Sequence, residues 1–291
     1  MEFKACLKKE FLEAKRGKTF ISIFGMCVAF ALFAILYLVI MRIASSVIQI
    51  DDEEIQILFS NTYGSSMSFF GAFMMTYFFL VLLFIYSNSI SKELNAKQWI
   101  LPINAGIKPK NLIAAKLIFA VVAVAISFIT SALVHFILTI LICESDGRAV
   151  VDMLICYASM LIFLEFITVI TISINAISKK RWLPILIILG TFMLISSTFS
   201  NIALKEMQPM GSITLNDLTP FFFQNLPLTF AYGFKYPAYV WISASVTTII
   251  IAAILVVFAL LTFKIKPEKA IGLENQKRSW FVFKRKNSEK E

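Results

Sequence analysis

The sequence predicts an all-α integral membrane protein with six transmembrane helices. Of its 291 residues, 59% are hydrophobic and only 15% are charged, whereas soluble globular proteins carry about 25% charged residues. The mean hydropathy is +0.81. The apolar residues form continuous runs of about 20 residues or more, which as helices would cross a hydrocarbon core of about 30 Å. None shows the ten-residue alternating pattern of a barrel strand.

These runs divide the chain into three parts. Residues 1–19 precede the first run, residues 20–263 hold the transmembrane domain, and residues 264–291 form a basic tail. The six predicted spans are about 20–41, 68–90, 113–142, 153–178, 183–203 and 238–263.

The amino-terminal segment predicts an amphipathic helix on the membrane surface. Phe3, Leu7, Phe11 and Ala14 recur at helical spacing, with lysines and glutamates between them. Gly17 then allows the chain to turn into the first span.

The basic residues predict the orientation. Twenty-three of the 27 Lys and Arg residues fall in the two tails, between spans two and three, and between spans four and five. The positive-inside rule therefore places both termini in the cytosol. Topology and attraction to anionic lipid explain this charge, so we expect the bilayer and no nucleic acid as a partner.

The long outer segment 204–237 contains four prolines and the aromatic block Phe221, Phe222 and Phe223. It is too apolar for a free loop and too broken for a span. We expect short helices that enter the outer leaflet, either as an interfacial anchor or as a gate or lid of a substrate path.

Two ionisable residues lie deep in predicted spans. Glu165 is the only acid there, and His135 is the only histidine in the chain. A charge in a bilayer is costly, so Glu165 is expected either to pair structurally or to line a translocation path. His135 is interpreted chiefly as an interhelical hydrogen-bonding residue, and a place in the translocation path is the other possibility.

No catalytic motif, metal-ligand spacing or nucleotide site is recognisable. Gly17-Lys18-Thr19 matches only the end of a phosphate-binding loop, because Leu12 stands where that motif needs a glycine. The chain is therefore not expected to be an enzyme or to hold a cofactor.

The segment 90–116 is the longest polar interruption on the predicted cytosolic side apart from the tails. It has five lysines and one acid, Glu93, and is too short for a core of its own. The order of these features resembles the membrane subunits of ABC-2-type exporters. Leu7-Lys8-Lys9-Glu10-Phe11 to Arg16 resembles the family's elbow helix, and Glu93…Leu101-Pro102…Gly106…Lys116 resembles its cytosolic signature. Lys97-Gln98-Trp99 departs from the Gly-Thr usual there.

This resemblance implies a permease that forms half of the path for a peptide, lipid or drug. Residues 90–112 would form a coupling helix that contacts a separate cytosolic ATPase, which binds ATP and Mg²⁺. A second copy or a related permease would complete the path in a bacterial plasma membrane. The expected coupling interface comprises Glu93, Gln98, Trp99, Ile100, Leu101, Pro102 and Gly106.

Two other functions remain open. An ion- or proton-coupled secondary transporter would use Glu165 as its coupling group, although no internal repeat of the kind found in such folds is evident. A membrane sensor or immunity protein would hold a ligand through 204–237.

Overall fold

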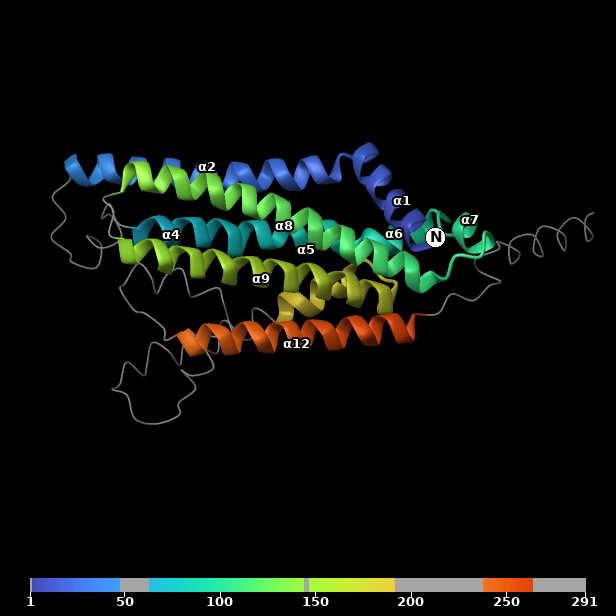
Figure 1. Ribbon diagram of the computed structural model, residues 1–291. Helices are drawn as coiled ribbons and strands as arrows, with labels where there is room; N and C mark the ends of the chain where they lie inside the picture. The colour runs from blue at the N-terminus through green and yellow to red at the C-terminus, as the bar shows by residue number, and fades with distance from the viewer. Residues whose placement is uncertain (1, 48–62, 144–146, 192–237, 264–291) are drawn as a thin grey trace, which may run out of the picture.

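The computed structural model describes residues 2–47, 63–143, 147–191 and 238–263. Within these ranges the secondary structure is helical, with no strand. The long helices lie side by side and run alternately in opposite directions (Figure 1). The acidic run 51–54, the segment 204–237 with its aromatic block, and the tail 264–291 lie outside the described residues.

Four helical segments are long and apolar enough to cross a membrane: Thr19–Ile40, Phe69–Asn95, Pro109–Ile142 and Met153–Ser178. They belong to α2 (Thr19–Val47), the run from α4 to α6, α8 (Pro109–Ile142) and α9 (Gly147–Ser178). These four candidate spans fall at the positions expected for spans one to four. Two further apolar helices follow at the expected positions of spans five and six, Trp182–Thr191 and α12 (Ala238–Thr262). Residues 192–203, the rest of predicted span five, lie outside the described ranges.

The third span begins four residues earlier than expected. Pro109 occupies the first turn of α8, after Lys108 in an extended conformation. Proline suits this position, because the first helical N–H groups have no intrahelical partner and its ring fixes a helical φ.

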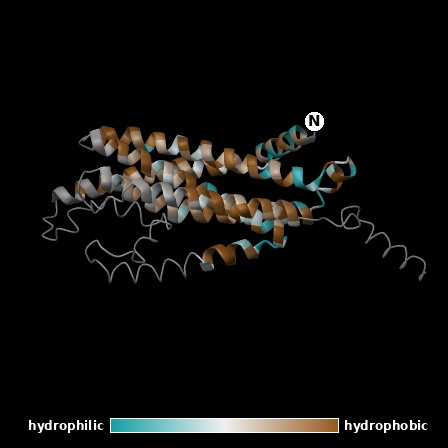
Figure 2. Cartoon of the chain, turned by 60° about the horizontal axis from the view of Figure 1, so that its bottom comes forward, coloured by the Kyte–Doolittle hydropathy of each residue, from teal (hydrophilic) through white to brown (hydrophobic). Residues whose placement is uncertain are grey.

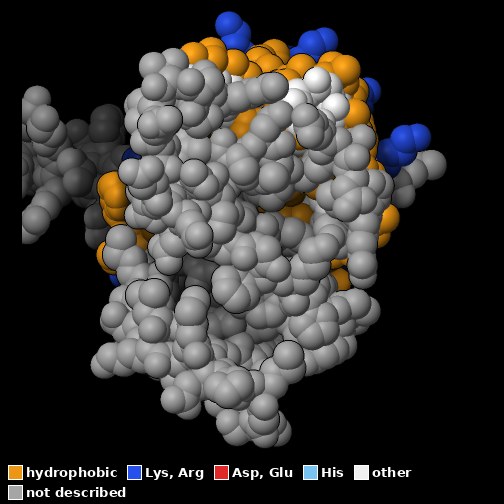
Figure 3. All heavy atoms as spheres, turned by 90° about the vertical axis from the view of Figure 1, so that its left-hand side faces the viewer, with side chains coloured by type: hydrophobic (Ala, Val, Ile, Leu, Met, Phe, Trp, Pro, Cys, Tyr) orange, Lys and Arg blue, Asp and Glu red, His pale blue; other side chains and the backbone are white. Residues whose placement is uncertain are grey.

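The two sides of α8 show the pattern of a helix in lipid. Its exposed side carries large apolar residues, among them Ile126, Leu133 and Ile137, whereas its buried side carries Ser127 and His135. Hydrophobic residues follow the length of the long helices in Figure 2, and hydrophobic side chains show at the edge of the bundle in Figure 3. Polar groups between helices and apolar groups outside are what a bilayer environment favours.

The second span is a composite helix. It comprises α4 (Tyr63–Ala72), a π-helical turn (Phe73–Phe78), α5 (Phe79–Ser87) and α6 (Ser89–Asn95).

Asn175 of α9 bonds the backbone where α5 gives way to α6. Its Oδ1 accepts hydrogen bonds from the backbone N–H groups of Ile90 (3.0 Å) and Ser91 (3.1 Å). Its Nδ2 donates to the carbonyl of Ser87 and to Oγ of Ser91. One buried amide therefore holds this junction against α9.

One end of the bundle gathers the basic residues. We call it the basic end: it consists of α1 (Glu2–Arg16), α6, α7 (Ile100–Asn104), the first turns of α8 and the turn 179–181 (Figure 1). Within the described ranges, every Lys and Arg other than Arg42 and Arg148 lies in these elements or in the short connections next to them. The charge asymmetry along the sequence is thus also an asymmetry in space.

Candidate functional site

The site begins with α1, which lies at the basic end and packs against α8. Its buried side presents Cys6, Glu10 and Ala14, spaced four residues apart, while Phe3 and Phe11 are exposed. A carboxylate therefore lies in the middle of a buried helix face. Such a group is tolerated only where other groups pair with it.

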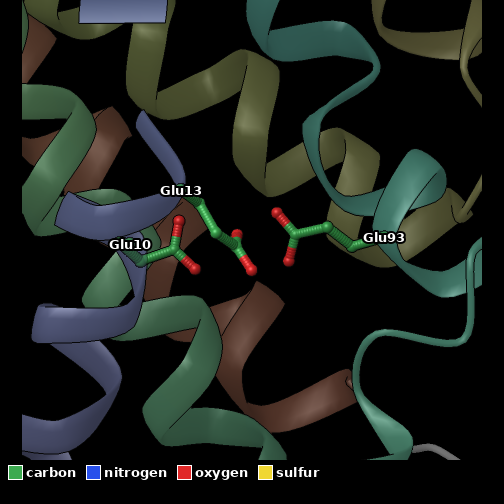
Figure 4. A group of neighbouring side chains, drawn as sticks. All are labelled: Glu10, Glu13 and Glu93. Atoms are coloured by element: carbon green, nitrogen blue, oxygen red, sulfur yellow. The ribbon is translucent and has the colours of Figure 1, made fainter. Parts of the chain in front are cut away.

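Lys116, near the start of α8, pairs with that carboxylate. Its Nζ lies 2.7 Å from Oε2 of Glu10 and also binds Oε1 of Glu93 in α6. All three residues are buried. Glu10 and Glu13 project from α1 toward Glu93, which projects from the facing helix (Figure 4). Lys116 thus joins three helices that are far apart in the sequence.

Lys9 adds a second cation. Its Nζ lies 3.0 Å from Oε1 of Glu13, and 3.4 Å from oxygens of both Glu10 and Glu93. Burial would lower the pKa of this ammonium, but the carboxylates of Glu93, Glu10 and Glu13 outweigh that effect and raise its pKa. Lys9 therefore stays charged in the folded protein at neutral pH. We call Lys9, Glu10, Glu13, Glu93 and Lys116 the ion-pair cluster.

The three carboxylates of the cluster lie close enough together to suggest a cation site. One oxygen from each of Glu10, Glu13 and Glu93 falls within 4.8 Å of the others. However, two lysine ammonium groups already bind these oxygens, and oxygen-ligated cations need such lone pairs free. The arrangement is explained by ion pairing.

Trp99 completes the surroundings of Glu93. Its indole Nε1 donates a 2.7 Å hydrogen bond to Oε2 of Glu93. The ring packs against Phe263 at the end of α12, with centroids 5.4 Å apart. Trp99 is only 2% exposed, so in this conformation it fastens the loop to the bundle and offers no surface to a partner.

The neighbours of Trp99 are placed differently. Leu101 in α7 is 79% exposed, and Gln98 is exposed beside it. Ile100 and Pro102 are half-buried. Gly106 ends the turn with φ of +86°, a conformation that favours glycine. Of the expected coupling residues, Leu101 presents the largest apolar group to the outside.

His135 lies in an enclosed polar network. Its Nε2 is 3.1 Å from Oγ of Ser66, which is 2.7 Å from Oγ1 of Thr139, and its Nδ1 is 2.6 Å from the hydroxyl of Tyr157. Phe70 stacks on the imidazole with a centroid distance of 4.3 Å. These contacts join α4, α8 and α9, which confirms the interpretation of His135 as an interhelical hydrogen-bonding residue.

Glu165 has no such network. Both of its carboxyl oxygens are buried, and within the described residues neither has a hydrogen-bond partner. The hydroxyl of Tyr86 in α5 is likewise buried and unpartnered. The structural pairing that was one expectation for Glu165 is therefore absent among the described helices.

Sequence reasoning missed two residues of this region. Glu10 belongs to the segment with the family resemblance, but its burial was signalled only by its place on the same helical face as Cys6 and Ala14. Asn175 was signalled only as an amide inside a predicted span. Neither signal identifies a partner, because the partners come from distant segments.

No protein-family model matches this chain, and no curated protein matches it.

Proposed function

We propose that this protein is the permease subunit of an ATP-binding cassette exporter. In this proposal it has six spans and both termini in the cytosol. The segment 90–112 contacts a separate ATPase, and α1 serves as the elbow helix. The ATPase binds ATP and Mg²⁺, and this chain moves an amphipathic or hydrophobic substrate, such as a peptide, lipid or drug.

The ion-pair cluster is the observation that supports this proposal most strongly. A loop that transmits force from a partner has to be attached firmly to the helices that move. Here the loop bearing α7 is fastened to α8 through Glu93 and Lys116, and to α1 through Lys9. The indole of Trp99 extends the attachment to α12. Force applied at the exposed Leu101 would be transmitted to α1, α8 and α12 through buried contacts.

Six helices would make half of a transporter, so the proposal includes a second copy of this chain or a related permease in the plasma membrane. The sides of α8 and α12 expose rows of large apolar residues, including Ile126, Leu133, Ile250 and Ile254. These surfaces suit lipid or a second membrane subunit.

The proposal is tested by affinity purification in mild detergent, with identification of the co-purifying chains and an ATPase assay. We expect a stoichiometric ATP-binding subunit that is lost in Leu101→Asp, because the substitution places a charge in the apolar contact. Ala5→Asp is the matched control, since it adds the same charge at an exposed position of α1. A partner retained by Leu101→Asp would contradict docking at α7, and a preparation without any ATPase would contradict the permease function.

The unpartnered carboxyl of Glu165 favours a second candidate, an ion- or proton-coupled secondary transporter. Burying a carboxyl without a hydrogen-bond partner costs free energy. Ionisable groups inside a membrane therefore usually serve a function or pair with another group. Under this alternative, Glu165→Gln abolishes transport and a protonophore stops it, whereas ATP depletion alone does not. Under the exporter proposal, Glu165→Gln only perturbs transport, and ATP depletion stops it. The sensor alternative depends on 204–237, outside the described residues.

A further inference from the structure

A basic cavity opens at the basic end, apart from the ion-pair cluster. Its volume is about 840 Å³, within the range of roughly 300–1,000 Å³ typical of ligand pockets. One wall is α6 with the α5–α6 junction, and the other is the turn after α9 with the first residues of the helix Trp182–Thr191. Four cations line it, Lys92, Lys179, Lys180 and Arg181, and none of the described residues that line it is acidic.

The cavity continues into an apolar surface. Trp182, Leu183 and Leu186 line its other part, and Trp182 and Leu186 are 60% and 67% exposed. These residues begin an apolar helix that runs alongside the membrane-spanning bundle. Tryptophan is enriched at the boundary between headgroups and hydrocarbon. The cavity therefore passes from a cationic part at the bundle end to an apolar part beside the helix Trp182–Thr191.

Both walls are fixed by Asn175. Besides holding the backbone of α6, its Nδ2 donates a 3.2 Å hydrogen bond to the carbonyl of Lys180. The hydroxyl of Ser178 accepts a 3.3 Å bond from the Lys180 backbone N–H. The guanidinium of Arg181 lies 5.1 Å from the centroid of the Trp182 ring. The cations are thus carried on an ordered turn before any ligand binds.

We propose that this cavity binds an anionic phospholipid. The phosphate lies among Lys92, Lys180 and Arg181, and one acyl chain follows Trp182 and Leu186. Basic pockets between membrane helices on the cytosolic side suit anionic headgroups. A soluble acidic protein would match the charge but not the apolar wall, which lies among membrane helices. The assignment does not depend on the exporter proposal.

Quenching of Trp182 by brominated lipid tests this assignment. The purified full chain is placed in nanodiscs that contain increasing fractions of phosphatidylglycerol or phosphatidylcholine with brominated acyl chains. The Trp182→Phe variant, measured in parallel, supplies the signal of the other tryptophans. We expect phosphatidylglycerol to quench Trp182 at a several-fold lower mole fraction than phosphatidylcholine.

The double variant Lys92→Gln/Lys180→Gln should remove most of this several-fold preference, because each basic group near the surface contributes to the attraction of anionic lipid. The matched control Lys108→Gln/Lys110→Gln removes two exposed charges at the same end and outside the cavity. It should keep the preference. Equal loss in both double variants would show bulk surface attraction and overturn the assigned site.

Two measurements on the unaltered protein keep the test decisive even if the double variant does not fold. The preference should weaken as salt rises from 0.05 to 0.5 M, because salt screens the headgroup contact. Inorganic phosphate at millimolar concentration should not abolish it. Loss with phosphate would indicate a free-anion site, and equal quenching by both lipids would overturn lipid binding and leave an acidic protein as the occupant.

Discussion

At the residue scale, Lys116 is the group on which the ion-pair cluster depends. It lies between two buried carboxylates on two other helices, and its removal would leave both without their closest cation. Breaking a buried pair from one side costs more than the pair contributes when intact, because the remaining charge stays desolvated.

We therefore predict that Lys116→Met destabilises the protein by about 3–5 kcal/mol. Thermal unfolding in detergent, followed by gel filtration, measures the loss. Lys110→Met, which removes an exposed lysine from the same helix, should unfold near the wild-type temperature. Equal melting of the two variants would show that Lys116 does not support the fold through its ion pairs.

Three lysines at the basic end adopt the left-handed conformation that usually favours glycine. Lys18, Lys97 and Lys179 have φ of 56°, 57° and 55°, and each follows a helix. A residue with a Cβ pays about 1–2 kcal/mol there, whereas glycine pays about 0.5–1 kcal/mol in unfolded-state entropy.

Lys97→Gly is therefore predicted to stabilise the protein by up to about 1 kcal/mol. The substitution removes the strain of a Cβ at positive φ, and the greater backbone entropy of glycine in the unfolded chain offsets part of that gain. Lys108→Gly is the control of opposite sign, since Lys108 has φ of −68° and gains nothing from glycine. Melting temperatures of the two variants should therefore move in opposite directions. A lower melting temperature for Lys97→Gly would contradict strain at this turn.

At the element scale, α8 carries most of the polar connections. Lys116 binds α1 and α6 at one end, Ser131 donates to the carbonyl of Cys27 in α2 at 2.9 Å, and His135 joins α4 and α9. Small residues on the facing side of α2, including Ala31 and Ala34, are buried. Such residues allow membrane helices to approach closely. α8 therefore makes polar contacts with α1, α2, α4, α6 and α9.

We predict that His135→Ala lowers stability by about 0.6–1.7 kcal/mol, which runs from the average to the largest contribution of one interhelical hydrogen bond in a membrane protein. Thermal unfolding against Thr130→Ala is the measurement, because the Thr130 hydroxyl is exposed and bonds only within its own helix. In a transport assay, folded His135→Ala should retain activity. Loss of transport at unchanged stability would instead place His135 in the substrate path.

At the scale of the whole molecule, α1, α7 and the turn 179–181 lie together at the basic end (Figure 1). Because positive charge favours the cytosolic side, we predict that this end faces the cytosol. The cysteines are suited to a labelling experiment, because Cys6, Cys27, Cys143 and Cys156 are all buried and none of them is in a disulfide.

A membrane-impermeant maleimide should therefore label Leu101→Cys only in inverted vesicles, and Ser145→Cys only in intact cells. Leu101 is exposed at the basic end, and residue 145 lies outside the described ranges between spans three and four. The unsubstituted protein supplies the background. The reverse pattern would invert the orientation, and labelling of both from one side would contradict the number of spans between them.

The helical membrane class, the first four candidate spans and the charge asymmetry can be predicted from the sequence alone. These depend on properties that add along the chain: run length, apolar content and the count of basic residues. The sequence does not show which side of each helix faces the bundle. The sides of α9, for example, differ little in hydrophobicity.

Tertiary structure decided how the site is built. Glu10 and Lys116 are 106 positions apart in the chain, and Lys9 and Glu93 are 84 apart. The sequence predicted Trp99 as a docking residue, yet packing placed it inside, against Phe263, and left Leu101 exposed. A buried charge or indole N–H is stable only beside groups that pair with it. Those groups come together only when helices from distant segments pack.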